Sequence, residues 1–164
     1  MANGFGFQID IRGLADMEQQ LEGMTEDFER NLSDSMNEYG MLLEEGARSL
    51  SHRDGGQLEA SIDFYSLTKK GGVMEGSVGS DLKYALKRHE DPYKLGTTRD
   101  KYDAGVKETD YYVDGLGRRT RQQPAWRGLK PGRKYVERAV VATEDEFEEI
   151  LAEALDKTLR GRGR

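Results

Sequence analysis

The fold is decided by residues 13–50, which read GLADMEQQLEGMTEDFERNLSDSMNEYGMLLEEGARSL. Apolar residues recur there at steps of three, four or seven, which keeps them on one side of a helix with 3.6 residues per turn. The opposite side is mostly acidic. The spacing therefore predicts one long amphipathic helix with an apolar stripe of Leu14, Met17, Leu21, Met24, Phe28, Leu32, Met36, Tyr39, Leu43, Ala47 and Leu50.

This predicted helix is long for so small a protein. It would span about 55 Å at 1.5 Å per residue, against about 30 Å for the width of a small domain. The stripe must therefore fold back, meet a second element or meet another copy of the chain. Gly23, Gly40 and Gly46 are the residues at which it can bend, since each costs up to about 1 kcal/mol relative to alanine. We predict one helix with a kink, or two helices broken near Gly40.

The composition limits the class of protein. The 164 residues suffice for one domain with a real core, and 20 glycines indicate many turns and extended loops. The absence of cysteine excludes disulfides and thiolate metal sites. No apolar run approaches the ~20 residues that span a bilayer, and the first seven residues lack the regions of a signal peptide. We expect a protein without a membrane anchor that stays in a cell or in a particle assembled there.

The charge is unevenly distributed along the chain. Residues 1–50 carry 3 basic and 11 acidic groups, whereas residues 92–134 carry 11 basic and 5 acidic groups, in a chain of net charge −6. Two readings stay open. The charges are either solvated faces of mixed sign, or the basic segment meets something negative, such as DNA or an acidic protein surface.

Short segments with strand patterns predict a small antiparallel sheet. Residues 5–11 alternate apolar and small or polar side chains, which indicates a strand. Residues 60–69 and 73–79 read as a hairpin whose mixed faces place it at a sheet edge or reaching out from the body. Residues 81–90 read as a short helix or a strand, and 108–113 as half of a protruding hairpin. Part of one of these last two segments is expected to complete the sheet.

The C-terminal third contains one clear element and one segment without periodicity. An apolar stripe from Tyr135 to Leu159 predicts a helix of about seven turns, followed by a disordered basic tail over 160–164. Residues 91–134 lack periodicity, and so long a run is expected to be functional or ordered only by a partner. The predicted fold class is α+β: one domain over 1–159 whose long N-terminal and C-terminal helices pack on a small antiparallel sheet, with 91–134 as a protruding loop or hairpin arm.

The residues that carry enzyme chemistry are sparse. His52 and His89 are not spaced as metal ligands, and for His89, beside Glu90, a surface or core-edge histidine is the favoured interpretation. No serine has the flanking glycines of a nucleophile elbow, and Gly115-Leu-Gly117 lacks the third glycine of a dinucleotide site. We expect no enzyme, no metal and no cofactor. A hydrolase with a carboxylate pair hidden among the helix faces stays as a third hypothesis.

Tyrosine, tryptophan and arginine cluster in the basic segment. These residue types are enriched at protein–protein hot spots, and they also stack on bases and contact phosphates. The acidic body favours protein contact, with the basic arm of one copy on the acidic helix of the next, and such head-to-tail contacts close into rings. The alternative is a nucleic-acid-binding module that uses 118–134 and the tail. We predict the partner or subunit contacts at Tyr111, Tyr112, Arg118, Arg119, Arg121, Trp126 and Arg127.

Three motifs in order resemble a known family. Gly55-Gly-Gln-Leu-Glu-Ala-Ser-Ile is similar to the Thr-Gly-x-Leu-x-x-Ser-Ile start of tailed-phage head–tail joining proteins, also described as tail-completion, neck or minor-tail-protein-Z-like. Tyr84-Ala85 with His89-Glu90 resembles the Tyr-Ala … His-Glu segment of that family. Gly132-Arg-Lys-Tyr-Val-Glu-Arg-Ala resembles the start of its C-terminal helix. The similarity extends over about residues 13–159.

The resemblance implies a structural protein of the virion, assembled in the host cytoplasm. Such proteins form a ring, usually of six copies, that joins the head to the tail, contacts other neck and tail proteins, and lets DNA pass without sequence-specific binding. The chain departs from the family in two ways. Asp54-Gly55-Gly56 replaces the threonine before the family's glycine, and the segment from Asp91 to Lys130 is longer and more basic than the loop expected there.

Overall fold

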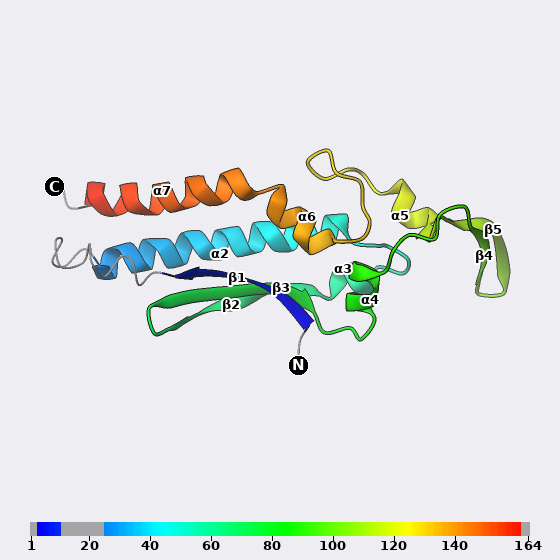
Figure 1. Ribbon diagram of the computed structural model, residues 1–164, viewed down its shortest axis with the longest axis horizontal. Helices are drawn as coiled ribbons and strands as arrows, with labels where there is room; N and C mark the ends of the chain where they lie inside the picture. Colours follow the sequence, from blue (N-terminus) through cyan, green and yellow to red (C-terminus); the bar gives the residue numbers. More distant parts are fainter. Residues whose placement is uncertain (1–2, 11–24, 162–164) are drawn as a thin grey trace.

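The computed structural model describes the backbone of residues 3–10 and, in full, residues 25–161. The helices are α2 (Thr25–Leu50), α3 (Gln57–Ala60), α4 (Ala85–Glu90), α5 (Arg118–Gln122), α6 (Tyr135–Val141) and α7 (Glu144–Gly161). The strands are β1 (Asn3–Asp10), β2 (Ile62–Lys70), β3 (Val73–Ser80), β4 (Thr98–Asp103), β5 (Val106–Val113) and β6 (Leu116–Gly117). The predicted α+β class is confirmed (Figure 1).

Helix α2 is the central element of the body. It runs without interruption through Gly40, so the predicted break there was wrong, while the part of the prediction over residues 13–24 lies outside the described residues. The predicted stripe is buried from Leu32 to Leu50. The stripe has two neighbours, because α2 lies between the sheet on one side and helices α6 and α7 on the other (Figure 1).

The sheet against α2 has three antiparallel strands in the order β1-β3-β2. β3 is therefore the central strand, and only β2 of the predicted hairpin lies at an edge. Neither of the candidate fourth segments joins this sheet. Residues 85–90 form helix α4, which was one of the two predicted outcomes, and residues 108–113 belong to β5 in a separate sheet.

Two glycines let α2 approach its neighbours closely. A Cβ atom on Gly40 would overlap the ring of Phe64 on β2, and one on Gly46 would lie 2.5 Å from a ring carbon of Trp126. Both residues are buried on α2. The predicted bending points are thus positions where an aromatic ring rests directly on the helix backbone, which explains why glycine is kept despite its helix cost.

The C-terminal helix is divided where one long helix was predicted. Thr143 separates α6 from α7, and its buried hydroxyl donates to the carbonyl oxygens of Ala139 at 3.0 Å and Val140 at 3.2 Å. The same hydroxyl lies 3.2 Å from the hydroxyl of Tyr39 on α2. A side-chain bond of this kind does not by itself end a helix, since Thr158 makes the same bond to Ala154 at 2.8 Å within α7. The predicted tail begins at Arg160, but α7 continues to Gly161; residues 162–164 lie outside the described residues.

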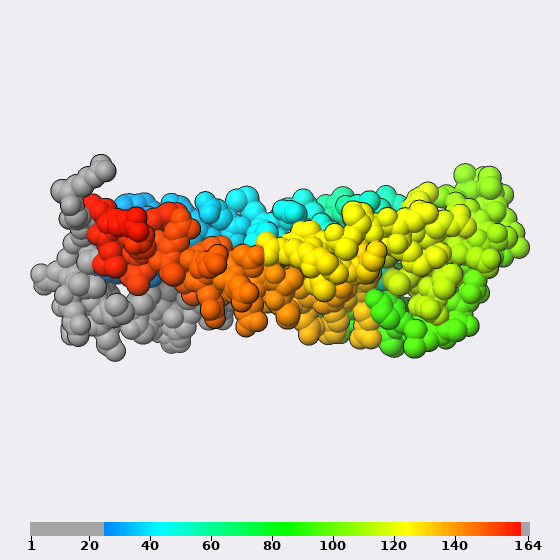
Figure 2. All heavy atoms as spheres, turned by 90° about the horizontal axis from the view of Figure 1, so that it is seen from above, coloured from blue at the N-terminus to red at the C-terminus, as the bar shows by residue number. Residues whose placement is uncertain are grey.

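We call residues 91–134 the arm. This segment, expected to be functional or ordered only by a partner, contains its own antiparallel sheet in the order β4-β5-β6, followed by α5. The strands β4 and β5 make the protruding hairpin, with Ala104 and Gly105 at positive φ in its two-residue turn. The molecule is elongated, with this hairpin at one end and the C-terminal part of α7 at the other (Figures 1 and 2).

Candidate interaction site at the base of the arm

The arm is fastened to the body by Asp54, in the turn between α2 and α3. Its carboxylate accepts hydrogen bonds from the hydroxyls of Tyr111 at 2.9 Å and Tyr112 at 3.1 Å, and it pairs with the ammonium group of Lys101. Burial raises the pKa of Asp54, but these three donors outweigh it and hold the pKa below its ordinary value. Asp54 is therefore the residue of the body that anchors strands β4 and β5 of the arm.

Backbone contacts reinforce the same junction. The backbone N–H of Arg53 donates to the hydroxyl of Thr120 at 2.9 Å, and that hydroxyl lies 3.0 Å from the carbonyl oxygen of Arg53. The guanidinium of Arg119 donates to the carbonyl oxygen of Asp54 at 2.5 Å. These hydrogen bonds attach helix α5 to the turn at 53–54, and Thr120, which makes two of them, is buried.

The predicted aromatic contacts are mostly used within the chain. Tyr111 is 1% exposed and packs edge-on against Tyr112, with ring centroids 4.8 Å apart. Trp126 covers Gly46 and donates from its indole nitrogen to Glu45 at 3.3 Å. Tyr111 and Tyr112 therefore attach strand β5 of the arm to the body, and Trp126 attaches the C-terminal part of the arm to α2.

The predicted arginines also have intramolecular partners. Arg118 pairs with Glu108 at 3.5 Å, and Arg119 pairs with Asp103 at 3.4 Å. Arg121 donates to the carbonyl oxygens of Asp110 and Tyr111 at 3.4 and 3.3 Å. Arg127 pairs with Glu146 on α7 and lies 5.0 Å from the ring centroid of Trp126. The structure therefore brings the seven predicted residues together along the arm, but as the groups that hold it in place.

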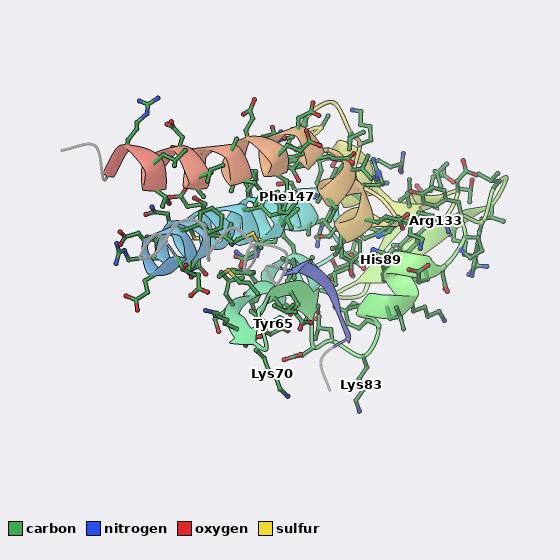
Figure 3. All side chains as sticks on the ribbon, turned by 60° about the vertical axis from the view of Figure 1, so that its left-hand side comes forward. Tyr65, Lys70, Lys83, His89, Arg133 and Phe147 are labelled. Carbon is green, nitrogen blue, oxygen red and sulfur yellow. The ribbon has the colours of Figure 1, made fainter. Side chains whose placement is uncertain are left out.

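Two of the three motifs that carry the family resemblance are in contact, at the point where α4 packs on the start of α6. The hydroxyl of Tyr135 donates to the carbonyl oxygen of Ala85 at 3.3 Å, and the ring of His89 meets Tyr135 edge-on at 4.7 Å. Glu90 binds His89 Nδ1 at 2.7 Å and Lys134 Nζ at 2.6 Å. These residues join α4 to the start of α6 (Figure 3). Burial lowers the pKa of His89 although Glu90 acts to raise it, which favours the neutral imidazole. Of the two predicted positions, surface and core edge, the surface is excluded because His89 is 1% exposed.

A hollow of about 740 Å³ lies between α4, the turn at 52–58 and the base of the arm. We call it the arm-base cleft. Four exposed cations line it from three segments: Lys87 and Arg88 on α4, Lys94 in the following loop, and Arg99 on β4. None of the four makes an ion pair with another residue in the described ranges 3–10 and 25–161. They are the functional candidates that sequence reasoning missed, because nothing in the sequence shows which cations already have a partner.

The carboxylates that line the arm-base cleft do not neutralise these cations. Asp54 is occupied by Lys101, and Asp100 pairs with Lys107 at 2.8 Å. Asp91 is the one acidic lining residue that makes no ion pair within the part of the chain that the structure describes. Three tyrosines complete the wall, which makes the cleft both cationic and aromatic; they are Tyr84, Tyr93 and Tyr112.

His52 lies in the wall of the arm-base cleft and makes stability depend on pH. Burial, with a smaller effect of Arg88, lowers the pKa of His52 to about 4. Above pH 6.5 the histidine is neutral in both the folded and the unfolded chain. As the pH falls from 6.5 to 4, the unfolded chain takes up a proton that the folded chain does not, so stability is lost. We expect a loss of about 2 kcal/mol between pH 7.5 and pH 5.

Urea denaturation at the two pH values measures this loss. His52→Gln cannot take up the proton and should show a smaller difference between pH 7.5 and pH 5, whatever its stability at pH 7.5. The change in the free energy of unfolding that remains in this variant comes from the other groups that titrate between these pH values, His89 and the carboxylates. An equal pH difference in the wild-type protein and the variant would contradict the assignment.

Within the described residues, no cluster of three or more histidine, aspartate and glutamate side chains is arranged to hold a metal ion. No helix in residues 25–161 combines the length and the apolar composition needed to cross a membrane.

Comparison with known proteins gives one match. Residues 15–86 match a family described as "Bacteriophage HK97-gp10, putative tail-component". The matched region is less than half of the chain, and it includes α2, the first resemblance motif and Tyr84-Ala85. The searches of curated proteins and of solved structures gave no match. The match supports the resemblance at the level of phage tail and neck components and stops before the arm.

Proposed function

We propose that this protein is a structural component of a phage virion that completes the tail or neck. In this proposal it joins head to tail as a ring, of about six copies, around the DNA channel, and it acts without catalysis. The observation that carries the proposal is the match of residues 15–86 to a phage tail-component family. Its neighbours would be other neck and tail proteins of the same particle.

The charge distribution supports assembly of copies head to tail. Helices α2 and α7 each carry 7 acidic and 2 basic residues, whereas the arm end of the molecule carries the basic excess. One acidic and one basic region on an elongated subunit favour heterologous contacts, and heterologous contacts close into rings. Acidic helices that face a channel would let DNA pass without binding its phosphates tightly.

The native mass of the purified protein, read together with negative-stain images, tests this proposal. We expect rings of about six copies. A monomer that persists at high protein concentration, together with DNA affinity that falls steeply with salt, would contradict it. That result would favour a nucleic-acid-binding module instead. The intramolecular partners of the arginines at 118–127 argue against the module.

Shortening the arm should abolish assembly and leave the body folded. Thr98 and Val113 are register partners of adjacent antiparallel strands, so residues 99–112 can be replaced by an Asn-Gly turn without moving the chain ends apart. The two buried clusters of the body contain none of the deleted residues. We expect a folded monomer by circular dichroism and sedimentation. Intact rings from this variant would show that residues 99–112 of the arm are not needed for assembly.

A further inference from the structure

We propose that the arm-base cleft binds the outer face of helix α7 from a second copy of this chain. The inference rests on the proposed function, because it names the contact by which neighbouring subunits would join. It starts from the cations of the cleft. Four exposed positive groups converge on one hollow without a carboxylate partner among the described residues, although most other cations of the arm have partners. A negatively charged ligand would relieve their mutual repulsion.

Exposed apolar side chains lie at the arm-base cleft as well as cations, so an anion alone would not cover the whole surface. Leu95 is 77% exposed in the loop that follows α4, next to the lining residue Lys94. Tyr84 and Tyr93 are also among the exposed large hydrophobic residues and line the cleft. A phosphate or a free carboxylate would leave this apolar surface in water. The face therefore fits a partner that combines carboxylates with aliphatic side chains.

Helix α7 presents this combination on its outer face. Phe147, Ile150, Leu151, Ala154 and Thr158 lie on the inner side, buried or partly buried against the core. The helical spacing places another set along one flank of α7, about a quarter turn from the inner side, which we call the outer face: Glu144, Asp145, Glu148, Ala152, Leu155 and Leu159. All six are exposed.

The carboxylates of this outer face have no cation of their own. Glu144, Asp145 and Glu148, with the adjacent Glu149, make no ion pair with any residue of the described ranges. Four unpaired carboxylates near the start of α7 thus match four unpaired cations in the cleft. The exposed Leu155 and Leu159 continue the same face, and the exposed rings of Tyr84 and Tyr93 line the cleft beside the cations. The two surfaces are complementary in charge, and each also carries exposed apolar side chains.

One molecule cannot make this contact with itself. Helix α7 lies across α2 from the sheet, whereas α4 lies on the side of the sheet at the arm end (Figure 1). The hollow of about 740 Å³ is where the outer face of the second copy's α7 would dock. A second copy displaced along the long axis would supply α7, and repetition of the step gives a head-to-tail assembly.

A charge swap in the full chain tests the contact. The cleft variant Arg88→Glu/Arg99→Glu should raise the protein concentration needed for assembly at least tenfold, and so should the helix variant Glu148→Lys/Glu149→Lys. The four-substitution variant should assemble again near the wild-type concentration, because the reversed charges attract one another. Analytical ultracentrifugation measures each assembly midpoint. Thermal unfolding should show that all variants fold, since the four residues make no ion pair within the described chain.

Lys70→Glu/Lys83→Glu is the matched control. Both lysines are exposed and reach away from the body (Figure 3), and the change in net charge equals that of the cleft variant. The control should assemble normally. Rings that form in the wild-type protein and resist both reversals would overturn the cleft contact but leave the ring proposal standing. A wild-type monomer would overturn both. Loss of binding to duplex DNA with unchanged rings would make the cleft a nucleic-acid site and also overturn the inference.

Discussion

Replacing Gly40 with leucine should lower the free energy of unfolding by about 3 kcal/mol, at the upper end of the usual cost of overpacking a core. Leucine has the better helix propensity by up to about 1 kcal/mol, so propensity alone predicts stabilisation. The tertiary structure predicts the opposite, because the ring of Phe64 occupies the space of the new side chain. Urea denaturation monitored by circular dichroism gives the difference in free energy.

A double-mutant cycle identifies the cause. Phe64→Ala removes the ring and should itself destabilise the protein, but Gly40→Leu/Phe64→Ala should be at least 1 kcal/mol more stable than the sum of the single effects predicts. Glu38→Leu is the control on an exposed position of the same helix and should change stability by less than about 0.5 kcal/mol. Additive effects of Gly40→Leu and Phe64→Ala would show that the ring is not what excludes the side chain.

Replacing Asp54 with alanine should release the arm while the body stays folded. The variant leaves the hydroxyl of the buried Tyr111 without its acceptor and Lys101, whose side chain is 18% exposed, without its nearest carboxylate. A buried unsatisfied hydroxyl costs about 1–3 kcal/mol, and the partly exposed ion pair adds less than a buried one would. We expect local opening of β4, β5 and β6 to become easier by about 3 kcal/mol.

Hydrogen exchange of peptides from 98–117 measures this opening. Asp103→Ala is the matched control, because Asp103 lies in the same sheet and contacts Lys101 and Arg119 at the longer distances of 3.7 and 3.4 Å. Its effect should stay below about 1 kcal/mol. Asp54→Asn should fall between the two, since the amide oxygen still accepts a hydrogen bond. Unchanged protection of the arm in Asp54→Ala would mean that the 53–120 backbone contacts alone hold it.

Local patterns were sufficient for the elements of the body. The spacing of Leu32, Met36, Tyr39 and Leu43 predicted the buried face of α2, because a helix repeats every 3.6 residues whatever packs against it. Strands β1, β2 and β3 followed from alternation and from the turn at 70–72 for the same reason. These predictions depend on residues close in sequence, where the geometry is nearly fixed.

Predictions failed where distant residues decide the local structure. Gly40 and Gly46 suggested bends, but rings from β2 and from the end of the arm rest on them. The C-terminal helix is divided at Thr143, and the hydroxyl of Thr143 lies 3.2 Å from the hydroxyl of Tyr39, 104 residues away. The hairpin over 98–113 carries few apolar side chains with a clear period, and Asp54 holds it from outside the segment. None of these contacts has a signature within a short window of sequence.

The sequence by itself determined the α+β class, the long amphipathic helix, the small sheet, the basic segment on an acidic body and the resemblance to phage neck and tail proteins. Only the tertiary structure decided which charged groups are available to a partner. Arg118, Arg119 and Arg127 are paired within the chain, whereas Lys87, Arg88, Lys94 and Arg99 make no ion pair with the residues that the structure describes. The physical reason is that an ion pair depends on a distance of a few ångströms between side chains, and the fold brings together groups that lie far apart along the sequence.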